Sequence, residues 1–138
     1  MRSTSGVRSA TQVFKHHGKA GEQRDLEAYV SDFSPHAVLI TPDAVYSGRS
    51  GVRKWVTEFW KKLEGAKFAV NREIHSGSVI FVRYKCMAHR YRILDGVATF
   101  VVSNGYFTVL TNSYTLIRRV RKSRNSDLRN GPRLLRNR

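Results

Sequence analysis

The sequence is poor in the features that mark several large classes of protein. Its single cysteine, Cys86, excludes an internal disulfide and has no metal-ligand spacing around it. No apolar run approaches the roughly 20 residues that a membrane-spanning helix needs. Residues 1–10 lack the apolar stretch of a secretory signal peptide. These absences predict a cytoplasmic protein without membrane association.

The chain also lacks the local motifs of common catalytic sites. It has no glycine-rich phosphate loop, no nucleophile elbow and no His-Glu metal motif. None of its five histidines shows metal-ligand spacing. We therefore expect neither a metal nor another cofactor.

Acidic residues are scarce, with 10 Asp or Glu against 25 Lys or Arg and a net charge of +15. Residues 118–138 hold nine of the basic residues and a single acid, Asp127. This tail could bind a nucleic acid or another acidic partner by counterion release. It has no aromatic residue to stack on bases, so we favour a disordered extension incidental to function. Residues 1–117 intersperse both signs, as a solvated surface does.

A length of 138 residues with 41% hydrophobic residues predicts one packed domain. Its clearest periodic segment spans residues 50–64, where apolar residues recur at helical spacing. Ser50 is the expected N-cap, and Gly65 suits the left-handed stop. Two shorter helices precede it, one over residues 10–20 and one from Leu26 to Phe33, which Asp25 caps and Pro35 ends.

Extended segments make up most of the remaining chain. Residues 38–41 and 44–47 read as a small hairpin or a crossover. Four further strands, residues 68–75, 79–88, 96–103 and 106–118, follow without an intervening helix and should pair antiparallel. Asn104-Gly105 favours a two-residue type I′ turn, so Ser103 should face Tyr106. That register places Asp95, Asn112 and Tyr114 on one side of the sheet.

These elements predict an α+β fold in which a strongly curved antiparallel sheet wraps around three helices as a cone. The wide mouth of such a cone cannot be filled by side chains, so we expect an apolar pocket for a small molecule. The expected organisation is a flexible N-terminus over residues 1–9, the α+β domain over residues 10–117 and the basic tail over residues 118–138.

The chain resembles SnoaL-like proteins of the nuclear transport factor 2-like superfamily over roughly residues 12–117. The resemblance rests on the run from Asp25 to Trp55 and on a second set of segments: Phe68 to Glu73, Asp95-Gly96, Thr99 to Val102 and Asn104-Gly105. It implies a cone-shaped α+β barrel and a homodimer formed through the outer face of the sheet. This superfamily hosts isomerases, cyclases, dehydratases, epoxide hydrolases and proteins without catalysis, so the fold alone does not select a function.

In the isomerase and cyclase relatives the pocket carries an acid and hydrogen-bond donors, which directs attention to Asp95, Asn112 and Tyr114. A carboxylate in an apolar pocket can move a proton, while Tyr and Asn can donate to an oxyanion. The alternative, which we favour for Asp95, is an ordinary turn residue before Gly96.

His17 lies on the apolar stripe of the first helix and could serve as a base in the pocket. A buried structural histidine is the more common outcome at such a position, and its neighbour His16 should be solvated. Glu73 is a further carboxylate, which we expect to form an exposed ion pair with Arg83.

Four aromatic residues are the expected walls of the pocket: Tyr29, Trp55, Phe59 and Tyr84. At helical spacing such residues are also plain core, and for Trp55 and Phe59 the two interpretations are equally good. Three functions then compete: a proton-transferring isomerase, cyclase or hydrolase on an apolar carbonyl-like or cyclic substrate, a non-catalytic binding module, and a binder of nucleic acid through the tail.

Overall fold

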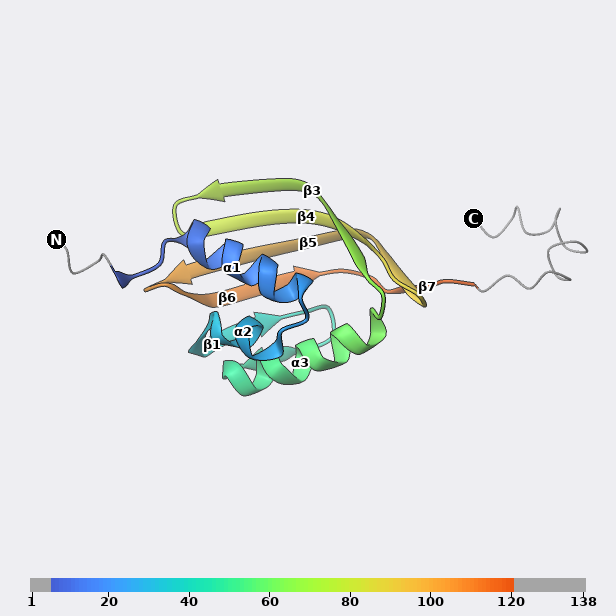
Figure 1. The fold of residues 1–138 in the computed structure, drawn as a ribbon, viewed down its shortest axis with the longest axis horizontal. Helices are drawn as coiled ribbons and strands as arrows, with labels where there is room; N and C mark the ends of the chain where they lie inside the picture. Colours follow the sequence, from blue (N-terminus) through green and yellow to red (C-terminus); the bar gives the residue numbers. More distant parts are fainter. Residues whose placement is uncertain (1–5, 121–138) are drawn as a thin grey trace, which may run out of the picture.

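The three predicted helices are present in the computed structural model, which describes residues 6–120 (Figure 1). They are α1 (Ala10–Glu22), α2 (Leu26–Ser31) and α3 (Gly48–Lys62). Ser9 and Gln12 form a reciprocal capping box at the start of α1. Asp25 caps α2 as predicted, because its side chain accepts a hydrogen bond from the backbone of Ala28.

The helix ends differ from the prediction at two places. α3 begins before Ser50, and Ser47 precedes it without a side-chain capping bond. α2 ends at Ser31, and Pro35 lies within the strand that follows instead of ending the helix. Pro35 is tolerated there because the pairing of this strand is irregular between Phe33 and Val38. Gly65 does adopt the predicted left-handed conformation after α3, with φ of 75°.

Seven strands form one curved, unclosed sheet: β1 (Phe33–Ile40), β2 (Val45–Ser47), β3 (Lys67–Ser76), β4 (Val79–Met87), β5 (Tyr91–Ser103), β6 (Tyr106–Ser113) and β7 (Ile117–Arg118). Their order is β2-β1-β6-β5-β4-β3, and β7 pairs with β5. The β1–β2 hairpin and the β3 to β6 meander confirm the predicted antiparallel pairs. The sheet is nevertheless mixed, because β1 pairs parallel to β6.

The predicted turn at Asn104-Gly105 is correct, but the register beyond it is not. Both turn residues have positive φ, and Ser103 pairs with Tyr106. A bulge at Thr108 then shifts the pairing by one residue, so that Ala98 instead of Val97 faces Asn112. The hydroxyl of Thr108 donates to the carbonyl oxygen of Val101 at 3.3 Å, which holds the bulge.

A second bulge changes the side chains of β3. Phe68 and Val70 pair with Cys86 and Tyr84, but the register shifts before Arg72. Ile74 therefore shares a face with its partner Phe81, not with the buried side chains of β4. Strict alternation along β3 would place Phe68, Val70 and Ile74 on one face, but it is interrupted after Val70, because a one-residue bulge exchanges the two faces of a strand.

The core lies between the concave face of the sheet and the helices. Phe33, Leu39, Val56, Phe107 and Leu110 are almost completely buried within it. Apolar burial of this extent is the main stabilising contribution in a domain of this size.

Residues next to both expected domain boundaries contact the folded part of the chain. Arg8, assigned to the N-terminal segment, is hydrogen-bonded to Gly105 and Asp32, while Arg118, assigned to the tail, pairs with Tyr91. The expected disorder of the tail from residue 121 onward lies outside the described residues. Among the helices of residues 6–120, none has the length and apolarity needed to cross a membrane.

Candidate functional site

A cavity of about 590 Å³ lies between the concave face of the sheet and the helices. Its wall is dominated by aromatic side chains: Phe14, Tyr29, Trp55, Phe59, Trp60, Phe68, Tyr84 and Phe100. The four predicted wall residues, Tyr29, Trp55, Phe59 and Tyr84, are all among them. Trp55 and Phe59 stack with their ring centroids 4.5 Å apart, because positions i and i+4 share one face of α3.

The cavity wall also holds polar side chains, Glu22, Arg24 and Lys67 among them, and two others bond to each other. The hydroxyl of Tyr84 on β4 donates to Oδ1 of Asn112 on β6 at 2.8 Å. Both residues are buried. This bond orients the Asn112 amide, so its Nδ2 group keeps two N–H donors for another partner. Burial raises the pKa values of Tyr84 and Tyr29, so both phenols stay protonated.

His17 contributes the titratable imidazole of the wall and is held by a buried carboxylate. Its side chain is 7% exposed, and its Nδ1 atom lies 3.2 Å from Oδ2 of Asp32. Tyr29 and Phe107 enclose the ring, with centroids 4.0 and 4.8 Å away. His17 thus lies where the sequence placed it, on the inner stripe of α1.

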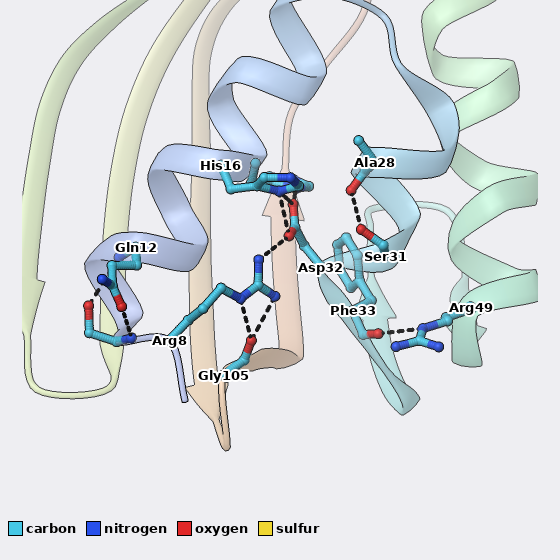
Figure 2. A network of polar contacts seen from close by, with 11 residues as sticks. Arg8, Gln12, His16, Ala28, Ser31, Asp32, Phe33, Arg49 and Gly105 are labelled. Carbon is cyan, nitrogen blue, oxygen red and sulfur yellow. Dashed lines mark hydrogen bonds and ion pairs between the residues drawn. The ribbon is translucent and has the colours of Figure 1, made fainter. Parts of the chain in front are cut away.

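Asp32, which the sequence analysis did not select, is the centre of this polar network. It caps the C-terminal end of α2, and its side chain is fully buried. Arg8 donates to Oδ1 at 2.8 Å, and Nδ1 of His16 lies 2.7 Å from the same oxygen. Figure 2 shows Arg8 and His16 converging on Asp32, while Arg8 also reaches the carbonyl oxygen of Gly105.

Two sequence signals point to Asp32 in retrospect. It lies between the apolar residues Val30 and Phe33, and an acidic side chain at the C-terminal end of a helix is unfavourable unless something compensates it. His16 is exposed as expected, but the sequence analysis did not foresee its bond to Asp32. Its ring is 45% exposed but bonds to Asp32.

The charges of the network follow from its surroundings. Burial acts to raise the pKa of Asp32, but hydrogen bonds from His17, His16 and Arg8 outweigh it and lower that pKa overall. For His17, burial outweighs the bond to Asp32 and lowers the pKa. At neutral pH, Asp32 is therefore a carboxylate and His17 a neutral imidazole. A carboxylate can only accept hydrogen bonds, so the His17 nitrogen that faces Asp32, Nδ1, carries the proton. The other nitrogen, Nε2, therefore keeps its lone pair.

Asp95 does not join this site. It lies beside Gly96 at a bulge on the outer side of the sheet, is 56% exposed and forms a two-bond ion pair with Arg83 at 2.9 and 3.0 Å. The expected pair between Glu73 and Arg83 is consequently wrong, because Glu73 instead contacts His75 at 2.7 Å.

The predicted cluster of Asp95, Asn112 and Tyr114 is thus dispersed, because the Thr108 bulge turns Asn112 inward while Asp95 stays outside. Tyr114 follows β6, and its hydroxyl accepts a hydrogen bond from Nε1 of Trp55 at 3.1 Å. Tyr114 is not part of the cavity wall but packs against two wall residues, Trp55 and Phe59. Burial raises the pKa of Cys86 to about 11, so its thiol is an unreactive core group. Within residues 6–120, no three His, Cys, Asp or Glu side chains are grouped so as to hold a metal.

Several solved structures share the fold of this chain. A protein of Kribbella flavida assigned as a ketosteroid isomerase superimposes with a TM-score of 0.67 at 14% identity, covering 86% of this chain and 87% of that one. One of Sinorhizobium meliloti assigned as a polyketide cyclase gives 0.63 at 17% identity, covering 72% and 92%. An LEH-like epoxide hydrolase of M. tuberculosis gives 0.62 at 12% identity, covering 77% and 82%.

These sequence identities are too low to transfer an activity, but the structural superpositions show that the chain has the nuclear transport factor 2-like fold. No curated protein matches the sequence significantly. The family model described as a SnoaL-like domain matches residues 15–109, which is most of the chain and includes His17, Asp32, β3 to β5 and the first half of β6. The chain belongs to the SnoaL-like family.

Proposed function

We propose that this protein is an enzyme that moves a proton on an apolar carbonyl-like or cyclic molecule bound in the cavity, with His17 as the base. The observation that carries this proposal is the His17–Asp32 pair at the wall of an aromatic cavity. The structural relatives assigned as isomerase, cyclase and epoxide hydrolase support the same class of chemistry.

The proposed step uses groups whose roles follow from their bonding. Nε2 of His17 takes a proton from a carbon next to a carbonyl group, and the electron pair of that C–H bond moves toward the carbonyl oxygen. Asp32 stabilises the resulting imidazolium through the bond to Nδ1 and keeps the ring in the reactive tautomer. Nδ2 of Asn112, oriented by Tyr84, donates to the oxyanion. Return of the proton from His17 to another carbon of the enolate completes an isomerisation. In a cyclisation, the enolate carbon instead bonds to a second carbonyl carbon of the same substrate, and the electron pair of that C=O bond moves to its oxygen, which takes the proton from His17.

The aromatic wall supports this role in two ways. Flat apolar side chains bind a cyclic substrate by contact and exclude water from the reacting atoms. Arg8 holds Asp32 in its charged form without entering the cavity wall, so His17 faces a fixed carboxylate. The base is therefore oriented before the substrate binds.

The test begins with the full-length protein and a thermal-shift screen of apolar ketones, epoxides, steroid enones and polyketide-like aromatics. A ligand at 100 times its Kd adds about 2.7 kcal/mol to the stability, which moves the midpoint by several degrees. Each ligand that shifts the midpoint is then incubated in D2O, and NMR follows deuterium incorporation next to the carbonyl group.

His17→Gln is expected to slow this exchange by about 10²-fold or more while ligands still raise the midpoint. Asp32→Asn should slow it as well, because it removes the charge that favours the imidazolium. Asp95→Asn is the matched control and should exchange at the unchanged rate, since it lies outside the cavity. Equal exchange by His17→Gln would exclude His17 as the base. Binding without exchange in the unmodified protein would leave a non-catalytic binding module.

A further inference from the structure

Two segments that are distant in the sequence bring four arginines to one end of the sheet. The turn after β4 leads into β5, and β7 pairs with the start of β5 through Tyr91–Arg118 and Arg92–Ile117 (Figure 1). The backbone N–H of Arg119 donates to the carbonyl oxygen of Arg90 at 2.7 Å. We call this surface the basic end; it comprises Arg90, Arg92, Arg118 and Arg119.

No carboxylate neutralises the basic end within residues 6–120. The ion pairs that acids of this range form with Lys or Arg use cations outside the basic end. They are Asp32 with Arg8, Glu27 with Arg53, Glu58 with Lys61 and Asp95 with Arg83. Arg90, Arg118 and Arg119 are exposed. The basic end therefore presents a concentrated positive charge to solvent.

Contacts with the fold restrain these cations. Nη1 of Arg119 donates to the carbonyl oxygen of Ala88 at 2.5 Å, and the Arg118 guanidinium lies 5.9 Å from the Tyr91 ring centroid. Nε of Arg92 is buried and has no hydrogen-bond partner in the described part of the chain. A restrained guanidinium loses less entropy on binding an anion than a freely rotating side chain does.

The chain continues from the basic end into residues 121–138, which add seven Lys or Arg and only Asp127 as an acid. More positive charge is thus covalently attached next to Arg119. Guanidinium groups bind phosphate oxygens in pairs of hydrogen bonds. The aromatic ring at the basic end, Tyr91, has Arg118 over its face, so base stacking is not the expected mode.

We propose that the basic end is a docking surface for a nucleic-acid duplex, which it contacts through the phosphate backbone without base preference. This proposal is independent of the proposed chemistry in the cavity. Nucleic acid is favoured over an anionic bilayer because the basic end consists of strand and turn and offers no amphipathic helix to insert between lipids.

The test measures binding of the full-length protein to a fluorescein-labelled 20-base-pair DNA duplex by anisotropy between 50 and 200 mM NaCl. The basic-end variant changes Arg90, Arg92, Arg118 and Arg119 to Gln. The control variant removes the same charge from exposed, unpaired positions on the helices by changing Lys15, Lys19, Lys54 and Lys62 to Gln. Because each phosphate contact contributes about 0.9 to the salt slope, the basic-end variant should lose about 3–4 units of slope and at least about tenfold in affinity.

The control variant should lose less than about threefold in affinity. The proposal is overturned if both variants weaken equally, since net charge alone would then explain binding. It is also overturned if the basic-end variant binds as the unmodified protein does, or if vesicles with 30% phosphatidylserine bind more tightly than the duplex at equal salt. Arg119 and Arg92 contact the fold, so the double variant Arg90→Gln with Arg118→Gln repeats the comparison, and circular dichroism verifies folding of each protein.

Discussion

At the position directly after α2, the carboxylate of Asp32 accepts hydrogen bonds from Arg8, His16 and His17. A buried carboxylate without such partners would take up a proton, so the three donors are what keep it charged. The consequence at the residue scale is a neutral His17 whose Nδ1 atom carries the proton, because its partner Asp32 is a carboxylate. Helical periodicity predicted the burial of His17, but it could not supply the partner, because Asp32 reaches α1 only through the packing of α2.

The lowered pKa of His17 predicts how stability depends on pH. Below pH 6.5, the ordinary pKa of histidine, the His17 side chain binds a proton in the unfolded chain but stays neutral in the folded protein. The free energy of unfolding should therefore fall as the pH drops from 7 to 5. The contribution is at most about 1.4 kcal/mol per pH unit. Asp32 acts in a different pH window. Its lowered pKa stabilises the fold above the ordinary value of 3.8, and this contribution is lost only as the pH falls below that value.

Urea unfolding at pH 7, 6 and 5 measures this effect. His17→Gln should reduce the slope of stability against pH in that window, and His36→Gln, which changes an exposed ring, serves as the control. The charged and titratable groups around His17 are Arg8, His16, Asp32 and Tyr29. An unchanged slope in the His17→Gln protein would show that this imidazole does not titrate differently on folding.

At the scale of elements, the decisive feature is the bulge in β6. Phe107 and Leu110 are both buried although they are three positions apart, which a regular strand with a period of two cannot achieve. Thr108 supplies the extra residue, and Asn112 then turns inward beside Tyr84. The Asn104-Gly105 residues alone predicted the hairpin turn. The bulge could not be predicted in this way, because it depends on the burial of both Phe107 and Leu110 in the core.

Gly96 has a defined role in the same region, since it pairs with Tyr84 across β4 and β5. A Cβ at this position would lie 2.2 Å from Cζ of Tyr84, so the ring would have to move away from Asn112. Gly96→Ala is expected to destabilise the domain by about 1–3 kcal/mol through overpacking. Urea unfolding measures the loss.

Gly18→Ala is the matched control for this prediction. Position 18 is an exposed helical site with no neighbour within 4 Å of the added Cβ, so alanine should stabilise α1 by about 0.5–1 kcal/mol. If Gly96→Ala were as stable as the unmodified protein, Tyr84 would have an alternative packing that keeps the sheet intact, and its role in orienting Asn112 would need revision.

At the scale of the whole molecule, the helices cover one face of the sheet (Figure 1). On the other face, Ile74 and Val79 are exposed, while Phe81, Val101 and Val109 are half-buried. An uncovered apolar face of this kind favours association, and the family resemblance implies a homodimer. We predict that this outer face joins two copies of the chain.

Phe81→Lys should convert such a dimer into monomers, because a charge in the centre of the face costs desolvation on both subunits. Val45→Lys at the exposed edge strand β2 is the control and should leave the association unchanged. Sedimentation equilibrium between about 1 and 100 μM measures the molecular mass. A monomeric unmodified protein across this range, or equal dissociation by both variants, would refute the prediction.

Local patterns in the sequence determined a large part of this protein. The stripe over residues 50–64, the Asp25 cap and the Asn104-Gly105 turn predicted elements that are present, because helix periodicity, capping and positive φ act within a few residues. Their order predicted the curved sheet on three helices, and the aromatic positions Tyr29, Trp55, Phe59 and Tyr84 do line a cavity.

Only the tertiary structure decided how charged and polar side chains combine. It grouped Arg8, His16 and His17 on Asp32 and moved Asp95 to the outer face. It also assembled the basic end from the turn before β5, the start of β5 and the segment around β7. The physical reason is the range of the interactions. A bulge is selected by what the core can bury, and a buried charge is stabilised by partners that are distant in the chain and meet only after the helices pack on the sheet.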